Sequence, residues 1–169
     1  ILFRQLEVLS SREQVIAALQ SVLGTARALS VDELIVALQT STGLDLTTYA
    51  AAWIRGSGAP QWPEAKITVT AGATESTVRI ELVKGAERRC KFAVGLFGAN
   101  PNTEQVFLDV NTFTDGPDQT LTIPTPAFAV TTTQVDTRAE CLVFKSTATA
   151  TTTPRPHPWT SGHIAPPAL

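Results

Sequence analysis

The chain has 169 residues, of which 43% are hydrophobic, and its formal net charge is −2. This length suits one ordinary domain or two small ones. The slightly acidic balance argues against a surface for nucleic acid or anionic membranes, which needs concentrated lysine and arginine. No apolar run approaches the roughly 20 residues of a membrane-spanning helix, so we expect no membrane span.

The start of the chain indicates that it belongs to a longer protein. It begins with Ile1 and contains no methionine. An initiator methionine is normally removed only when a small residue follows it, and isoleucine is large. We therefore expect further sequence before Ile1, and the lack of a signal peptide here says nothing about the parent protein.

Helices are predicted before residue 60. Residues 1–9 are apolar without a clear pattern and are expected to be the end of a helix. Two stretches then begin with Ser-x-x-Glu, at Ser10 and Ser30, which predicts a capping box at each. Gly24 and Gly43 are natural helix stops. The expected apolar faces are Val15, Ile16, Leu19, Val22 and Leu23 in the first helix and Val31, Leu34, Ile35 and Leu38 in the second.

A third short helix is predicted after Asp45, whose carboxylate can cap it. Its apolar residues follow the spacing i, i+3, i+4 and i+7 and form one face. They are Leu46, Tyr49, Ala50 and Trp53. Three short helices make a thin core, which supplies only a few kcal/mol. We expect the helical segment to be stabilised by packing against the sandwich or against other helices of the parent protein. Trp53, Trp62 and Tyr49 are expected in this inter-domain packing.

After Pro60 the hydrophobic period changes from about 3.6 residues to 2. Seven short alternating stretches follow, separated by turn residues. They cover 66–70, 78–82, 90–96, 106–110, 121–123, 128–130 and 141–144. This pattern predicts an antiparallel β-sandwich, because no helical period separates the strands. The expected fold class is α+β, with a helical segment 1–60, a β-sandwich domain 61–145 and a Thr/Pro-rich tail 146–169.

The two cysteines, Cys90 and Cys141, lie in different predicted strands. They could be buried free thiols, which behave as small hydrophobic side chains. They could instead form one disulfide, which would imply an extracytoplasmic compartment, periplasmic or secreted. The sequence leaves both alternatives open, because it does not place the two Cα atoms within reach of each other.

One stretch resembles a known family. It combines a helix starting at Ser-x-x-Glu, the run from Thr42 to Leu46 (Thr-Gly-Leu-Asp-Leu), a helix with Trp53, and Gly-x-Gly-x-Pro ending at Pro60. This resembles the end of the catalytic domain in aminopeptidase-N-like (gluzincin) zinc metallopeptidases. In that family a small β-sandwich follows, similar to the strand-like stretch here. The resemblance covers roughly residues 10 to 145.

The resemblance implies a parent protein that removes N-terminal residues from peptides with zinc-bound water. The family binds zinc through H-E-x-x-H on a helix, a motif that this chain lacks. The family's further zinc-binding Glu and its catalytic Tyr lie upstream of the resembling segment, so no catalytic, cofactor-binding or metal-binding residue is expected here. The chain departs from the family at Tyr49, where members often carry a larger aromatic pair, and some members add a helical domain after the sandwich.

Other candidate catalytic or metal-binding residues have little support in the sequence. His157 and His163 lie six residues apart in the tail without Cys, Asp or Glu beside them, so a structural zinc site lacks ligands there. We expect exposed histidines, with a weak adventitious metal site as the alternative. Ser57 lacks the flanking glycines of G-x-S-x-G and is expected in a simple turn. Neither cysteine has a histidine in its own domain to form a reactive pair.

Two groups of charged residues are expected to be ordinary surface. Aspartates in or near the predicted loops could bind calcium as an alternative, but their spacing does not match D-x-D-x-D-G. They are Asp109, Asp115, Asp118 and Asp136. A basic group is expected to form a solvated face at a strand edge. It consists of Lys84, Arg88, Arg89 and Lys91.

Two functions are compatible with these observations. The first is the non-catalytic C-terminal part of an aminopeptidase-N-like zinc metallopeptidase, which packs through its helices and Trp53 against the upstream catalytic domain of the same polypeptide. The alternative is a secreted β-sandwich module for binding or adhesion with a Thr/Pro linker. Two or three coplanar exposed rings on one sheet face would favour the alternative.

Overall fold

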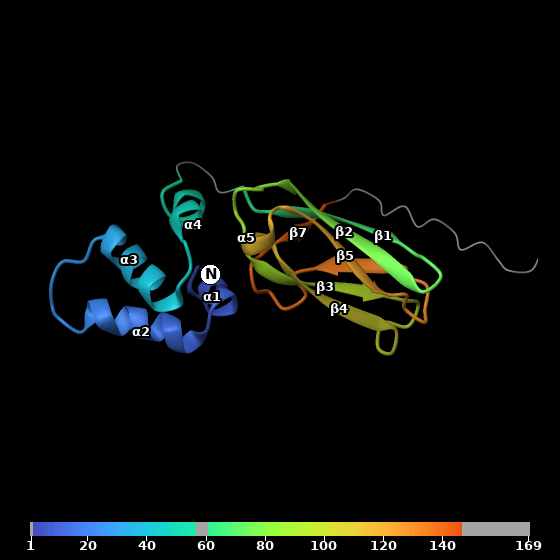
Figure 1. Cartoon of the computed structure of the whole chain (residues 1–169), viewed down its shortest axis with the longest axis horizontal. Helices are drawn as coiled ribbons and strands as arrows, with labels where there is room; N and C mark the ends of the chain where they lie inside the picture. The colour runs from blue at the N-terminus through green and yellow to red at the C-terminus, as the bar shows by residue number, and fades with distance from the viewer. Residues whose placement is uncertain (1, 57–60, 147–169) are drawn as a thin grey trace, which may run out of the picture.

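Helices occupy one end of the molecule and strands the other (Figure 1). The computed structural model describes residues 2–56 and 61–146. Within these ranges the N-terminal helices are α1 (Leu2–Leu9), α2 (Arg12–Leu23), α3 (Val31–Thr42) and α4 (Thr47–Trp53). The three predicted helices are present, and α1 occupies the stretch that was expected to be the end of a helix. None of the described helices has the length and apolar character needed to cross a membrane.

The capping chemistry predicted for α3 is confirmed. Ser30 Oγ accepts the Glu33 N–H at 3.2 Å, and Glu33 Oε2 accepts the Ser30 N–H at 2.9 Å, which completes a capping box. The Ser30 N–H and the Arg27 guanidinium hold the pKa of Glu33 at about 2. Gly43 ends the helix with φ +71°, a conformation that glycine adopts without strain.

The predicted cap of α2 is wrong by one residue. Ser11 is the N-cap and its hydroxyl accepts the Gln14 N–H at 3.2 Å. Ser10 closes α1 instead, because its hydroxyl donates to the Leu6 carbonyl at 2.7 Å. Gly24 does end α2, but with φ −65° it is right-handed and not the left-handed stop that the sequence suggested.

The helices share a small core of their own. Its buried members are Leu6, Val15, Ala18, Ile35, Leu38, Leu46, Tyr49 and Ala50. Three residues predicted on the buried faces, Ile16, Leu23 and Val31, are exposed. The reason is geometric: each helix packs against few neighbours within the described chain, so only the centre of its apolar stripe is covered.

Two sheets face each other in the second part. Their strands are β1 (Glu64–Thr70), β2 (Glu75–Lys84), β3 (Lys91–Phe97), β4 (Gln105–Asn111), β5 (Asp118–Pro124), β6 (Thr132–Val135) and β7 (Phe144–Lys145). One sheet has the order β5-β2-β1-β7 and the other β4-β3-β6. All pairs are antiparallel except β1 with β7. The short helix α5 (Thr112–Asp115) connects β4 of one sheet to β5 of the other.

The predicted strand at 128–130 is wrong. The sixth strand is Thr132–Val135. Its pairing with the end of β3 begins where the Thr131 N–H donates to Phe97 O at 2.8 Å. Phe128 lies against Gly98, and Val130 packs on the sandwich core. The alternation that suggested a strand therefore reflects a loop whose apolar side chains are half-buried.

The sandwich core lies between the two sheets. Its centre consists of Val78, Ile80, Phe92, Val94, Leu96 and Val110, all of them fully buried. Trp53 of α4 packs against this core and also against the helical core. The two parts are thus joined through α4 as well as through α1, which lies beside the sandwich in Figure 1.

Candidate functional site at the junction of helices and sandwich

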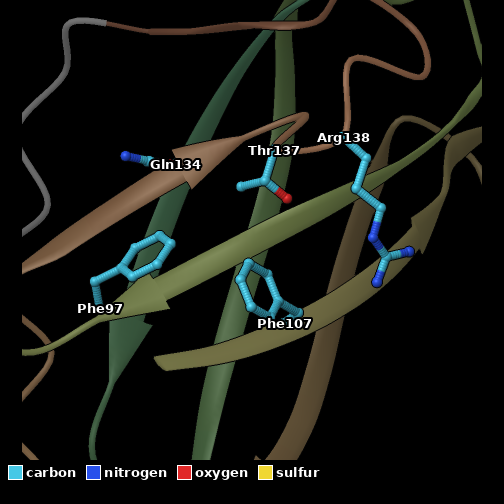
Figure 2. A pocket seen from close by; sticks show the side chains of 5 residues that line it. All are labelled: Phe97, Phe107, Gln134, Thr137 and Arg138. Carbon is cyan, nitrogen blue, oxygen red and sulfur yellow. The ribbon is translucent and has the colours of Figure 1, made fainter. Parts of the chain in front are cut away.

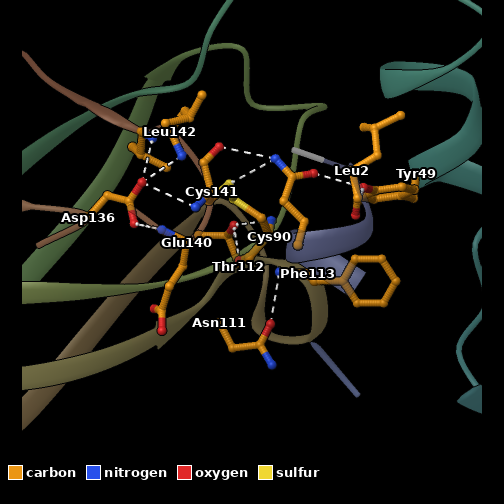
Figure 3. Close-up of a disulfide and its surroundings, with 12 residues drawn as sticks. Leu2, Tyr49, Cys90, Asn111, Thr112, Phe113, Asp136, Glu140, Cys141 and Leu142 are labelled. Atoms are coloured by element: carbon orange, nitrogen blue, oxygen red, sulfur yellow. Dashed lines mark hydrogen bonds between the residues drawn. A yellow bond between two sulfur atoms is a disulfide. The ribbon is translucent and has the colours of Figure 1, made fainter. Parts of the chain in front are cut away.

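A polar chain of contacts crosses the junction. Tyr49, buried on α4, donates from its hydroxyl to Gln5 Oε1 at 2.7 Å and lies 3.3 Å from Leu2 O. Gln5 is 1% exposed, and its Nε2 donates to Cys141 O at 3.1 Å. Burial raises the pKa of the Tyr49 phenol well above its ordinary value. Figure 3 shows Tyr49 and Cys141 on opposite sides of this contact.

The sandwich side of the junction is built around a disulfide. Cys90 and Cys141 are joined, with Cα atoms 6.1 Å apart, and both are fully buried. Thr112 at the start of α5 holds Cys90 in place: its hydroxyl accepts the Cys90 N–H at 3.0 Å and donates to Cys90 O at 2.9 Å. The bridge therefore ties the entry of β3 to the loop before β7 (Figure 3).

The loop before β7 is organised by Asp136. Its carboxylate accepts backbone N–H groups from Glu140 at 2.7 Å, Cys141 at 3.1 Å and Leu142 at 2.5 Å. Asp136, Ala139 and Leu142 have positive φ, an uncommon conformation for such residues. These hydrogen bonds satisfy the donors of an irregular loop and aim the Cys141 carbonyl at Gln5.

Aromatic side chains cover the rest of the junction. The ring centroids of Trp53 and Trp62 are 5.9 Å apart, and those of Tyr49 and Trp53 are 6.3 Å apart. Phe113 of α5 meets Tyr49 edge-on at 6.4 Å. The three residues predicted for inter-domain packing are thus adjacent. Phe113 joins them because Asn111 caps α5, with its side chain accepting the Phe113 N–H at 3.1 Å.

Arg88 belongs to the junction and not to a solvated face, so that part of the prediction is wrong. Its side chain is 13% exposed and lies over the Trp53 ring at 5.7 Å. Arg88 Nη1 donates to Gln61 O at 2.5 Å. The Trp53 indole N–H and Arg88 Nε are buried without hydrogen-bond partners among the described residues. The Arg88 guanidinium therefore contacts the Trp53 ring through a cation–π interaction.

Three of the loop aspartates contact polar groups of the chain itself. Asp136 faces N–H donors, which is the opposite of what a cation requires. Asp109 pairs with Arg138 at 3.1 Å, and Asp115 accepts the Thr114 hydroxyl at 2.8 Å. Across residues 2–56 and 61–146, no three His, Cys, Asp or Glu side chains are grouped as metal ligands. Ser57, His157 and His163 lie outside the described residues.

A shallow pocket lies on the outer face of the sheet β4-β3-β6 (Figure 2). It is lined by Phe97, Phe107, Gln134, Thr137 and Arg138. Phe97 and Phe107 are 5.8 Å apart with their planes at 85°. Sugar-stacking platforms need parallel exposed rings, so this edge-on pair does not provide one. The observation gives no support to the alternative of a secreted binding or adhesion module.

Sequence reasoning missed Gln5, Thr112 and Asp136 as junction residues. Gln5 stands out only in retrospect, as a polar residue among apolar neighbours on a helix. A buried amide needs partners, and that requirement could have marked it. Asp136 and Thr112 carry no local signal, because their partners depend on the folding of distant segments.

Comparisons with known proteins find similarity among solved structures. No family model matches the sequence, and no curated protein matches it. Among solved structures, Legionella pneumophila aminopeptidase A, determined in complex with aspartic acid, is similar with a TM-score of 0.62 and 18% identity. The alignment covers 88% of this chain and 17% of that chain. At such low identity the likeness shows the fold, which is one found within an aminopeptidase.

Proposed function

We propose that this chain is a non-catalytic C-terminal part of an aminopeptidase-N-like zinc metallopeptidase. It comprises the last helices of the catalytic domain and the β-sandwich that follows, and it serves as a structural and inter-domain packing module. The parent protein removes N-terminal residues from peptides. The partner of the module is the upstream catalytic domain of the same polypeptide.

One observation carries this proposal. A single alignment with an aminopeptidase spans helices and sandwich together, over 88% of this chain. A likeness confined to the sandwich would have little weight, because that architecture serves many functions. The joint match supports a unit in which the junction itself is retained. The similar sequence features at residues 42–60 point in the same direction.

The helices carry surface that suits a packing role. Leu23 is 64% exposed and Val36 is 61% exposed. Further large apolar side chains on or beside these helices are Phe3, Ile16, Val31 and Ile54. Apolar surface of this kind is typical of residues that contact another domain. In the proposal, these side chains face the catalytic domain.

The zinc of the parent does not fit the residues described here. No grouping of metal-binding side chains exists in the described ranges, and the histidine pair of H-E-x-x-H is missing from the sequence. The proposal therefore assigns the zinc ligands to the upstream domain and no chemical step to this chain.

The test is a hydrolysis assay on aminoacyl and peptide substrates with zinc added. The 169-residue chain is expected to show no turnover, while the full-length parent polypeptide is expected to be active and to carry H-E-x-x-H before Ile1. Zinc-dependent turnover by the chain alone, or a parent without that motif, would overturn the proposal.

A pair of variants in the parent tests the packing role. Val36→Asp places a charge on the exposed helix surface, and a buried unpaired carboxylate is costly. We expect a several-fold loss of folded, active parent protein. Val83→Asp makes the same change at a residue of β2 that is also exposed, at 47%, and is expected to leave activity unchanged. Equal effects of the two variants would contradict the assignment of the surface.

A further inference from the structure

Strand β4 is the outer strand of its sheet. All seven of its residues pair with β3, and no other strand within residues 61–146 pairs with it. It lies along the lower side of the sandwich in Figure 1. Gln105, Phe107 and Asp109 are exposed, and the Phe107 side chain is exposed by 47%. The backbone groups along this edge can therefore bond to another strand.

The hydrogen bonds at the two ends of β4 show which residues face the open edge. The Gly98 N–H donates to Glu104 O, and the Thr112 N–H donates to Cys90 O, both at 2.9 Å. Strand residues direct their peptide groups to alternate sides, so the even-numbered residues of β4 face β3. The N–H and C=O groups of the odd-numbered residues, with Phe107 at the centre, face the open edge.

The residues along this edge are mostly apolar. The run from Val106 to Val110 reads Val-Phe-Leu-Asp-Val, and β4 contains neither lysine nor proline, the residues that commonly discourage edge pairing. Its one charged residue, Asp109, is already paired with Arg138 of the same chain at 3.1 Å. The outer strand of the other sheet, β5, is more polar and ends in Pro124. A partner strand is therefore expected at β4 and not at β5.

We propose that β4 pairs with the β4 of a second copy of this chain, antiparallel and about a twofold axis at Phe107. The two sheets then join in the order β6-β3-β4-β4-β3-β6. On the outer face the two Phe107 rings meet, each beside its own Phe97 at 5.8 Å. On the inner face Val106 meets Leu108 of the second copy, and both side chains are only partly buried in the single chain. Directly opposed apolar side chains stabilise strand pairs.

Charges select this register over its neighbours. With the axis at Phe107, Asp109 faces Gln105 of the second copy, whose amide can donate to the carboxylate. With the axis at Asp109, the two carboxylates would face each other, and opposed like charges are destabilising. With the axis at Leu108, each Phe107 would face a carboxylate instead of a ring. A second copy fits because the edge is complementary to itself, as a twofold interface requires.

This contact is separate from the packing surface that the proposed function assigns to the helices. Strand β4 belongs to the sandwich, whereas Leu23 and Val36 are exposed on α2 and α3. A chain tested without an upstream domain can also associate through those helix side chains. The experiment therefore includes a variant of each surface, so that the two contacts are told apart.

The test measures the molar mass of the 169-residue chain by sedimentation over a series of protein concentrations. We expect a monomer–dimer equilibrium. Phe107→Lys should raise the dissociation constant about ten-fold or more, because two lysines would face each other across the axis. Thr120→Lys is the matched control, since it places a lysine at an exposed residue of β5, and it should leave the constant unchanged.

Amide exchange measured by NMR examines the same contact at single residues. The Phe107 and Asp109 amides face the open edge and should exchange more slowly as the protein concentration rises. The Leu108 amide faces β3 and should be protected at every concentration. The Thr120 amide faces the open edge of β5, because the Thr125 N–H donates to Thr74 O on the β2 side, and it should stay unprotected.

Two charge variants test the register at an exposed residue. Gln105→Lys places a cation opposite Asp109 and should tighten the dimer several-fold, whereas Gln105→Glu places an anion there and should weaken it several-fold. Equal responses of the two variants would overturn the register.

Three results would overturn the proposal itself. The first is a monomer at every concentration. The second is a dimer that Val36→Asp disrupts and Phe107→Lys does not, which would assign the contact to the helices. The third is an equal effect of Phe107→Lys and Thr120→Lys. Circular dichroism shows that each variant is folded, and the hydrolysis assay of the proposed function is unaffected by any of these results.

Discussion

Gln5 and Cys141 are joined by a hydrogen bond of 3.1 Å although 136 positions separate them in sequence. The bond links the first helix to the loop that carries half of the disulfide. Because Tyr49 donates to the same Gln5 amide at 2.7 Å, three segments meet at one buried polar group. The integrity of the junction therefore depends on the Gln5 side chain.

Gln5→Leu is expected to destabilise the fold. The change keeps a similar volume but leaves the Cys141 carbonyl without its partner and the Tyr49 hydroxyl with only the longer contact to Leu2 O. The loss is expected to cost about 1–3 kcal/mol. Urea unfolding measures the free energy of unfolding. Gln20→Leu on the exposed surface of α2 is the matched control and should stay within about 0.5 kcal/mol of the unaltered chain. A Gln5→Leu effect as small as that of the control would contradict the role of the bond.

Removing the disulfide is expected to lower stability strongly. The bridge spans 51 positions, and closing a loop of that length stabilises by about 4 kcal/mol in the chain-entropy account. Urea unfolding with and without dithiothreitol measures the difference, with the Cys90→Ala/Cys141→Ala variant as a reference that cannot respond to the reductant. If two thiols were alkylated in the native protein without reductant, the bridge would be absent.

Stability is expected to fall in alkaline solution through Tyr49. Burial raises the pKa of this phenol in the folded state, whereas the unfolded phenol titrates near its usual value of about 10. The unfolded chain thus releases the proton first, and the free energy of unfolding decreases above that pH by about 1.4 kcal/mol per pH unit. The chain has a single tyrosine, so tyrosinate absorbance reports on it alone.

The control for this prediction is the same titration in urea. Tyrosinate should form near the ordinary pKa in the unfolded chain and at distinctly higher pH in the folded one. Coinciding titration curves under native and unfolding conditions would mean that the phenol is open to solvent. Tyr49→Phe should abolish this part of the alkaline pH dependence.

Arg88→Ala is expected to loosen the aromatic part of the junction. It removes the cation over Trp53 and the hydrogen bond to Gln61 O, which together stabilise by about 1–2 kcal/mol. Tryptophan fluorescence should shift to longer wavelength as Trp53 gains access to water. Arg79→Ala is the control, because Arg79 is largely exposed on β2. Equal shifts in both variants would argue against a specific contact.

The fold class could be predicted because the signals are local. Period-2 alternation marks strands such as 78–82, and the Ser30 capping box marks the start of α3, since each depends on neighbouring residues. The strand predicted at 128–130 is absent because alternating hydrophobic residues indicate which side chains are covered and do not show that the backbone pairs with another strand. A loop that packs Phe128 and Val130 gives the same pattern as a strand.

The junction was only partly predictable. Tyr49 and Trp53 could be proposed because their helical spacing reveals an apolar face. The placement of Arg88 against Trp53 depends on how the chain turns after β2, which charge patterning does not encode. The Cys90–Cys141 pairing likewise depends on the approach of two Cα atoms from segments that are distant in sequence, a tertiary property.

The separation between Gln5 and Cys141 also has a consequence for synthesis. A ribosome adds about 5–20 residues per second, so α1 emerges on the order of ten seconds before the loop that completes the junction. During this interval the Gln5 amide and the apolar face of α1 have no sandwich to cover them. Any polypeptide that precedes α1 in a longer chain therefore meets this helix before the sandwich can.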